Sequence, residues 1–175
     1  MMIARDIGRE LRLGDMDLEA LEWGGLLHDV GKIGVPDTVL RKTEKLTDLE
    51  LAQITGHAEL SARIVEGVLA PEQVEWIRTH HERPNGEGYP DGLTTEDIPE
   101  GAGLLALADA FDVMTISRPY SRPKTTDVAI EECCELSGVQ FMPVAVAALL
   151  QLHQEGEFGG PGGGGAVAVG ARKPI

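Results

Sequence analysis

The chain has 175 residues, of which 42% are hydrophobic and 25% are charged. These values fit one folded domain and exclude a wholly disordered protein. Acidic residues outnumber basic ones by 29 to 15, giving a formal net charge of -14. Broad non-specific binding to nucleic acid or anionic membrane needs a basic surface, so both are excluded and we expect no DNA partner.

No segment has the length of a membrane-spanning helix. The longest weakly polar run, residues 142–152, is well below the about 20 residues that a bilayer requires, and no signal peptide opens the chain. Cys133 and Cys134 are adjacent, which does not suit a disulfide bridge. We therefore expect reduced thiols in a cytoplasmic protein without a membrane span in this chain.

Apolar spacing predicts helices along most of the chain, and hence an all-α fold. Asp17 is the predicted N-cap of a helix that Gly31 ends. Its apolar positions are Leu18, Leu21, Leu26, Leu27 and Val30. Thr47 and Glu50 have the spacing of a capping box, at the start of a helical stretch that runs towards Leu69 and that Gly56 can split.

The second half of the chain contains a long loop and three further helices. Pro71 suits the first turn of a helix that ends near His81. A loop is predicted from Arg83 to Gly101, and loops of this length are usually functional. The helices that follow are Leu104–Met114, with Asp109 and Asp112 at i and i+3, Thr126–Leu136 and Pro143–His153. Residues 156–175 are glycine-rich, which predicts a flexible tail behind a domain of residues 1–155.

Four of the five histidines fall at predicted helix ends: His28, His57, His80 and His81. A single histidine on a helix is more often a core residue than a ligand. His28 next to Asp29, together with adjacent histidines before Glu82, favours a metal site instead. Imidazole and carboxylate suit zinc, iron, manganese or nickel. A bridging carboxylate such as Asp29 lets two metals lie about 3.5–4 Å apart.

Two motifs extend this interpretation. The run LLHDVGKIG at 26–34 resembles the signature of HD-superfamily metal phosphohydrolases. The run HHERPNGEGYP at 80–90 resembles the HHE…GxGYP motif of the HD-GYP family, the cyclic di-GMP phosphodiesterases of bacterial signalling. The stretches 106–112 and 118–120 match the same family, and the resemblance covers residues from near 5 to about 152. It implies a compact HD-type helical bundle with an internal metal centre and a long GYP loop.

The resemblance also implies roles for individual residues. It implies two divalent metal ions, iron or manganese, with Asp29 as the bridging ligand. The implied metal ligands are His28, Asp29, His57, His80, His81 and Asp109. Asp29 and Lys32 are the implied catalytic residues. The implied substrate-binding residues are Lys32, Gly86, Gly88, Tyr89, Pro90 and Arg118. The chemistry agrees, because two metals activate water and neutralise phosphate while Lys32 adds a cation.

Plainer interpretations stand beside these roles. Lys32 can be a helix C-terminal cation that the macrodipole favours. Asp112 is expected to make a structural hydrogen bond, and Glu82 is expected to anchor the loop rather than to bind a metal.

The sequence departs from the family in four respects. Many members carry a further metal-binding histidine upstream of the HD pair, and no histidine precedes His28. We therefore expect a truncated first helix and one metal with an incomplete protein shell. Gly103, Ser121 and Met142 are the other departures, and we expect them to weaken helix packing or phosphate contacts.

The function expected from these motifs is metal-dependent hydrolysis of cyclic di-GMP to pGpG and on to GMP, in second-messenger signalling. One alternative is a degenerate module that binds cyclic di-GMP or protein without turnover, which the four departures motivate. Another is an HD phosphohydrolase of a different nucleotide, against which the GYP loop argues. The resemblance also implies sensor, receiver or diguanylate cyclase domains as partners.

Overall fold

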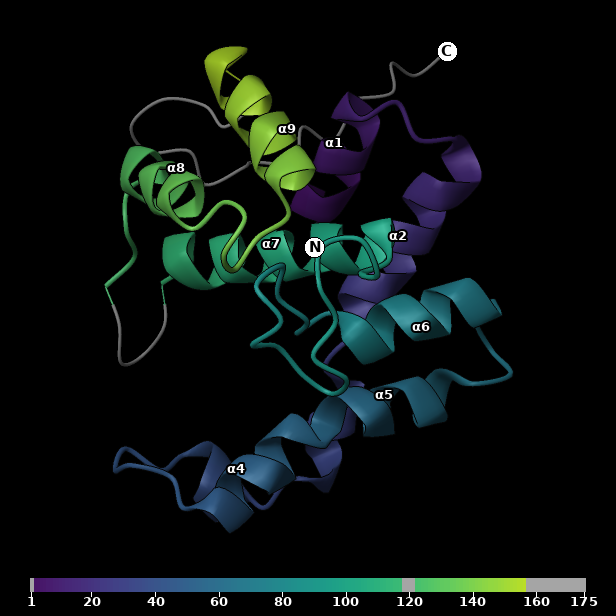
Figure 1. Ribbon diagram of the computed structural model, residues 1–175, viewed down its shortest axis with the longest axis vertical. Helices are drawn as coiled ribbons and strands as arrows, with labels where there is room; N and C mark the ends of the chain where they lie inside the picture. Colours follow the sequence, from purple (N-terminus) through teal and green to yellow (C-terminus); the bar gives the residue numbers. More distant parts are fainter. Residues whose placement is uncertain (1, 118–121, 157–175) are drawn as a thin grey trace, which may run out of the picture.

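Figure 1 shows the computed structural model, which describes residues 2–117 and 122–156. This part of the chain is helical and contains no β-strand, so the predicted all-α class is confirmed. The helices are α1 (Met2–Glu10), α2 (Asp15–Leu27), the short 3₁₀ helix η1 (Val30–Gly34), α3 (Asp37–Leu40), α4 (Asp48–Thr55), α5 (His57–Val65), α6 (Pro71–Thr79), α7 (Glu100–Thr115), α8 (Thr126–Glu135) and α9 (Pro143–Gln154).

Helix α7 lies at the centre of the fold (Figure 1), and α1, α2, α6, α8 and α9 pack against it. A helix surrounded in this way must be apolar on most of its circumference. Its side chains Leu104, Leu105 and Leu107 are fully buried in the main hydrophobic core. Asp109 interrupts this apolar sequence and is only partly buried, which places one carboxylate of the central helix at an edge of the core.

Two of the departures from the family lie in contact with each other. A Cβ atom at Gly103 would lie 2.1 Å from Sδ of Met142. The methionine side chain therefore fills the space that a larger residue at position 103 would take. Met142 is also the residue directly before α9, so this contact helps to seat α9 on α7. The expectation that Gly103 and Met142 weaken helix packing or phosphate contacts stays a prediction, and Ser121 lies outside the described residues.

Helices α3 and α4 form a lobe that projects from the body of the molecule (Figure 1). Helix α4 packs against α3 and α5 and buries none of its own residues. The predicted capping box is present, because Thr47 Oγ1 accepts from Glu50 N and the Glu50 carboxylate accepts from Thr47 N. Lys42 donates to the same carboxylate at 2.6 Å and is the main cause that lowers the pKa of Glu50 to about 2. Helix α4 is therefore held by polar contacts rather than by burial, whereas α3 buries Val39.

Some predicted boundaries need correction. The N-cap of α2 is Gly14; Asp17 lies in the first turn, where its negative charge favours the helix through the macrodipole. Leu26 is exposed instead of packed in the core. Helix α7 begins at Glu100, so the loop ends before the predicted Gly101. The break at Gly56 and the starts of α6 and α9 at prolines are as predicted.

Both cysteines are free thiols, as predicted, and burial raises the pKa of Cys133 to about 12. Of the helices described, none combines the length and the apolar character needed to cross a bilayer. The segment from 157 onward lies outside the described residues, so the domain boundary at 155 and the flexible tail stay predictions.

Candidate metal centre

Three histidine rings are held in the same way, each by the backbone carbonyl three residues earlier. The Nδ1–O distances are 2.9 Å for His28 to Gly25, 2.6 Å for His57 to Ile54 and 2.6 Å for His80 to Ile77. These carbonyls lie in the last turns of α2, α4 and α6, where a helix leaves carbonyl groups unpaired. A carbonyl oxygen only accepts, so each Nδ1 is the donor and each ring turns its Nε2 atom away from its own helix.

The Nε2 atoms of His28, His57 and His80 are buried and have no hydrogen-bond partner, and neither has Oδ1 of Asp29. A buried polar group left unpaired costs about 1–3 kcal/mol, so this concentration of such atoms needs an explanation. Ligand-type atoms of Asp29, His57, His80 and His81 lie within 4.8 Å of one another. Nitrogen and carboxylate oxygen converging in this way fit a divalent transition metal.

A second group of ligand-type atoms lies on the other side of Asp29. Nε2 of His28 is 3.4 Å from Oδ2 of Asp29 and 3.7 Å from Oδ1 of Asp109. The other oxygen of Asp29, Oδ1, is 3.2 Å from Nε2 of His57. Asp29 thus turns one oxygen to each group, as a bridging carboxylate would. The structure brings together all six side chains that the sequence singled out as ligands.

The electrostatics of the site follow from this crowding. Burial raises the pKa of Asp29, but neighbouring His28, His57 and Lys32 outweigh it and hold that pKa far below its usual range. Burial lowers the pKa of His28, yet Asp109 and Asp29 together raise it to about 9. A proton on His28 therefore occupies the position between carboxylates that a metal cation would otherwise fill.

The adjacent histidines behave in the opposite way. Burial, followed by the charge of His81, lowers the pKa of His80 to about 3. Burial and then the charge of His57 lower the pKa of His81 to about 3. Both rings are neutral at physiological pH, which is the form in which imidazole binds a metal.

Close backbone packing holds η1, which directly follows His28 and Asp29, against α5. The Gly31 N–H donates to Oγ of the fully buried Ser61 at 2.8 Å. A Cβ atom at Gly31 would lie 2.2 Å from the carbonyl oxygen of His57. Any side chain there would push η1 away from α5, and with it Asp29 from His57. Ser61 could not be identified from the sequence, because a lone serine in a helix carries no signal of this contact.

Lys32 lies beside the carboxylate rather than apart from it. Its Nζ atom is 2.6 Å from Oδ2 of Asp29, and its side chain is partly exposed. The residue is in the last turn of η1, so the helix-end interpretation also holds. The ammonium group therefore lies against the candidate ligand carboxylate while its side chain is partly open to solvent.

The GYP loop follows the His80–His81 pair and is fastened by a buried carboxylate. Glu82 is only 3% exposed and accepts hydrogen bonds from the N–H groups of Asp91, Gly92 and Leu93 at 2.7, 3.1 and 2.9 Å. Arg78 of α6 adds an ion pair to Asp91. Glu82 therefore ties residues 91–93, in the middle of the loop, to the beginning of the loop, in agreement with the anchoring role expected for it.

The middle of the loop turns back onto the histidines. A Cβ atom at Gly88 would lie 2.4 Å from the backbone nitrogen of Arg83, so only glycine permits this approach. The Tyr89 N–H donates to the carbonyl of His81 at 3.3 Å, and the two rings lie with centroids 4.8 Å apart. Gly86 has a left-handed φ of 77°. Gly86, Gly88, Tyr89 and Pro90 thus belong to one folded loop beside the candidate ligands.

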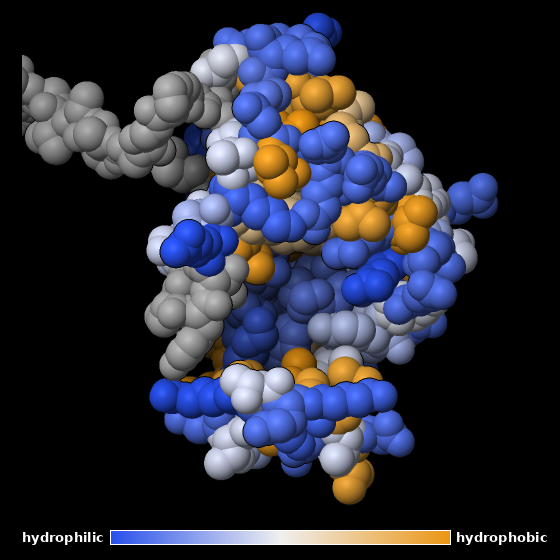
Figure 2. Space-filling model, turned by 90° about the vertical axis from the view of Figure 1, so that its left-hand side faces the viewer, coloured by the Kyte–Doolittle hydropathy of each residue, from blue (hydrophilic) through white to orange (hydrophobic). Residues whose placement is uncertain are grey.

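A pocket of about 390 Å³ opens next to this loop. Its wall contains the candidate ligands His80, His81 and Asp109, and also includes Arg83, Glu87, Tyr89, Gln140 and Phe141. On the side of the molecule shown in Figure 2, hydrophilic surface lines a hollow between the α4 lobe and the body above it. A larger hollow of about 490 Å³, between α1 and α2, has no imidazole in its wall, so the chemistry favours the smaller pocket.

Several of these residues could not be singled out from the sequence. Gln140 comes from the turn before α9, some fifty residues beyond the GYP loop, and belongs to no motif. Arg118, the other predicted phosphate-binding residue, lies outside the described residues.

Comparison with known proteins shows the family to which this chain belongs. The family model described as HD domain matches residues 1–143. The chain is 37% identical over 152 residues to a cyclic di-GMP phosphodiesterase of Thermotoga maritima, covering 85% of this chain and 41% of that protein. It is 34% identical over 146 residues to 3'3'-cGAMP-specific phosphodiesterase 2 of Vibrio cholerae, covering 82% of this chain and 28% of that protein.

Solved structures show the same fold. A HDG"Y"P protein from Bdellovibrio bacteriovorus superposes with a TM-score of 0.68 at 21% sequence identity, over 87% of this chain and 49% of that one. A cyclic GMP-AMP-specific phosphodiesterase of Vibrio cholerae gives 0.66 at 23%, over 89% and 43%.

The chain therefore belongs to the HD domain family. Within that family it carries an HD-GYP domain, because its HD pair, HHE sequence and GYP loop come together with relatives of that kind. The chain spans less than half of the length of these curated relatives.

Proposed function

We propose that this chain is a metal-dependent phosphodiesterase that hydrolyses cyclic di-GMP to pGpG and on to GMP. The observation that carries the proposal is the set of buried, unpaired Nε2 atoms that converge on Asp29 beside a pocket of nucleotide size. The names of the curated relatives support the same reaction class.

We assign two divalent metal ions, iron or manganese, to the two groups of atoms around Asp29. One would be held by Asp29, His57, His80 and His81, and the other by His28, Asp29 and Asp109. Such ions supply the Lewis acidity that neutralises phosphate oxygens and makes water a nucleophile at neutral pH.

The chain itself positions the substrate. Lys32 carries an ammonium group beside Asp29, where it can bind a phosphate oxygen whose negative charge grows in the transition state. The buried backbone carbonyls hold the histidine rings in one tautomer, so the rings need not reorient when their Nε2 atoms bind a metal ion. Arg118 remains a predicted contact to the second phosphate.

A second substrate is 3'3'-cGAMP, which also has two 3′–5′ phosphodiesters. It is favoured by one specific observation, the presence of cGAMP-specific phosphodiesterases among relatives that cover most of this chain. The candidate metal ligands would act on the phosphodiester, which both molecules share, so they would not distinguish the two cyclic dinucleotides.

The test is product formation from both cyclic dinucleotides by protein supplied with Mn²⁺ or Fe²⁺. We expect cleavage by the wild type, loss of cleavage in Asp29→Asn, and unchanged cleavage in Glu96→Gln, a control at an exposed acid of the same loop. Binding without cleavage by the metal-loaded wild type would contradict the proposal and indicate the degenerate module.

We also propose that the domain works with a sensor, receiver or diguanylate cyclase domain. The resemblance to the HD-GYP family supports this arrangement, and the curated relatives are longer than the matched region. Co-purification with such a domain and its effect on turnover would test it.

A further inference from the structure

The pocket wall also contains residues that differ in chemistry from the candidate metal ligands. They include a guanidinium, a carboxylate, a primary amide and two aromatic rings, from Arg83, Glu87, Gln140, Tyr89 and Phe141. Among the described residues, the side chains of Arg83 and Gln140 have no hydrogen-bond or ion-pair partner. The pocket thus offers uncommitted donors and acceptors next to the metal centre.

The Glu87 carboxylate is held in a defined position. The Asn85 side-chain amide donates to Oε2 of Glu87 at 2.8 Å, and the Glu87 N–H donates to Oδ1 of Asn85 at 3.1 Å. This pair of hydrogen bonds fixes one carboxylate oxygen and leaves Oε1 available. The anchoring of the loop by Glu82 restrains the same segment from its other end.

We propose that these side chains form a guanine-selective base pocket, with Glu87 as the residue that distinguishes guanine from adenine. Guanine presents two adjacent donors, N1–H and the N2 amino group, which a carboxylate accepts. It presents acceptors at O6 and N7, which a guanidinium or an amide can bind. Adenine has no hydrogen at N1 and an amino group in place of O6, so it can make only a single contact to Glu87 through N6 and offers Arg83 only N7.

The same lining argues against a second phosphate site. A carboxylate beside the cation would repel a phosphate, whereas a planar base can use both charges at once. Tyr89, whose ring packs on His81, and the buried Phe141 add apolar surface to the wall beside the base. The charge of Glu87 therefore decides between base and phosphate as the occupant.

The size of the pocket limits how much ligand it holds. Its volume of about 390 Å³ is near the lower end of the range for small-molecule sites, about 300–1,000 Å³. We therefore assign one nucleotide unit of a cyclic dinucleotide to it. The discrimination applies to the base next to the scissile phosphate.

This inference rests on the proposed function for its substrate class, but binding can test it without hydrolysis. The probes are GMP and AMP, which contain no phosphodiester, and their affinities for Mn²⁺-supplied protein are measured by calorimetry. We expect GMP to bind at least about tenfold more tightly than AMP, as a paired hydrogen-bond contact to one base allows. Glu87→Gln should bring the ratio close to one, while Glu96→Gln leaves it unchanged.

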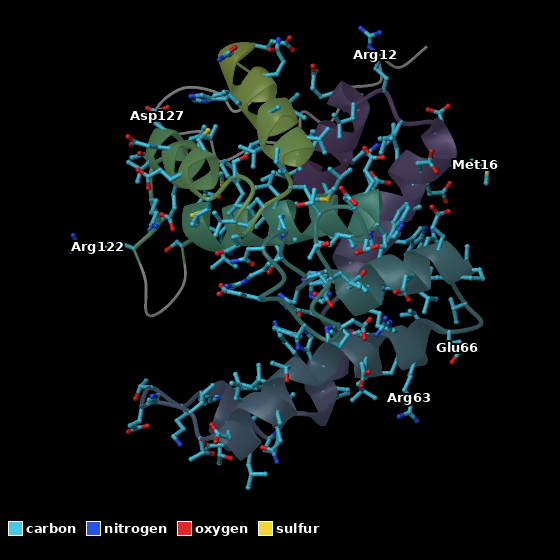
Figure 3. All side chains as sticks on the ribbon, in the orientation of Figure 1. Arg12, Met16, Arg63, Glu66, Arg122 and Asp127 are labelled. Carbon is cyan, nitrogen blue, oxygen red and sulfur yellow. The ribbon has the colours of Figure 1, made fainter. Side chains whose placement is uncertain are left out.

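Arg83→Ala gives an independent variant, with Arg63→Ala as its matched control. Arg63 is an exposed arginine that projects from α5 on the side away from α6 (Figure 3). We expect weaker GMP binding in Arg83→Ala alone. Equal affinities for GMP and AMP in the wild type, no detectable binding of either, or a ratio unaffected by Glu87→Gln would overturn the base pocket.

The two proposals fail in different ways. Cleavage of cyclic di-GMP, 3'3'-cGAMP and cyclic di-AMP at equal rates would leave the phosphodiesterase intact and remove the base pocket. Selective binding of GMP without cleavage of any cyclic dinucleotide would retain the base pocket and remove the phosphodiesterase.

Discussion

The Glu82 carboxylate should be the main fastening of the GYP loop, so its removal is expected to release the loop while the helices remain folded. Three backbone N–H groups donate to this 3%-exposed carboxylate. A hydrogen bond to a charged group is worth about 1.5–3 kcal/mol. Water can reach the exposed Asp91 end of the loop and replace part of this, so we expect Glu82→Ala to cost about 3 kcal/mol rather than the full sum.

For a chain of this size such a loss lowers the melting temperature by about 6–12 °C. Hydrogen exchange of the amides at 91–93 should accelerate more than exchange in α7. KM for the cyclic dinucleotide should rise because Tyr89 and Glu87 lose their fixed positions. Glu82→Gln keeps one acceptor oxygen and should be intermediate, and Glu96→Ala should match the wild type. Wild-type exchange at 91–93 in Glu82→Ala would refute the anchoring argument.

Three other predictions concern the site. Lys32→Ala should reduce kcat about 10²-fold with little change in KM, since a cation that acts on developing charge contributes mainly to the transition state. Steady-state kinetics of this variant, with Arg63→Ala as the control, would show the effect. A change in KM alone would contradict the prediction. Gly31→Ala should cost about 1–3 kcal/mol by forcing η1 from α5, and should weaken Mn²⁺ binding in a titration followed by calorimetry; wild-type affinity would be the contrary result. Without metal, stability should peak near pH 6.5. The pKa values of His80 and His81 are lowered to about 3, so the unfolded chain binds more protons and stability falls as the pH drops below the unfolded value of 6.5. The pKa of His28 is raised to about 9, so the folded chain binds the extra proton and stability falls as the pH rises from 6.5 to 9. Thermal unfolding against pH checks this, and in His28→Asn the alkaline decline should disappear.

Much of the architecture could be predicted from local signals. The capping box of Thr47 and Glu50 and the prolines at the starts of α6 and α9 mark helix ends through their own backbone chemistry, and all are where the sequence indicates. The N-cap of α2 could not be chosen in this way. Gly14 and Asp17 both suit a helix start, and the buried contacts of Leu18 and Leu21 decide between them.

The candidate ligands could be recognised because two motifs contain four of them. Their geometry could not, since it depends on contacts between segments far apart in the chain. The close packing of Gly31 on His57, and of Met142 on Gly103, depends on the space between helices, which no local sequence pattern indicates. The pocket wall shows the same limit, because Gln140 reaches the GYP loop only through the packing of α7, α8 and α9.

The central claim is that the unpaired histidine nitrogens around Asp29 bind metal ions. Elemental analysis of purified protein, after loading with Mn²⁺ or Fe²⁺ and removal of free metal, tests it most directly. We expect two metal ions per wild-type chain, fewer in His57→Asn, and loss of both in Asp29→Asn, with each variant checked for its helical content. A folded Asp29→Asn chain that retains the wild-type stoichiometry, or a wild-type chain that retains no metal, would contradict the account.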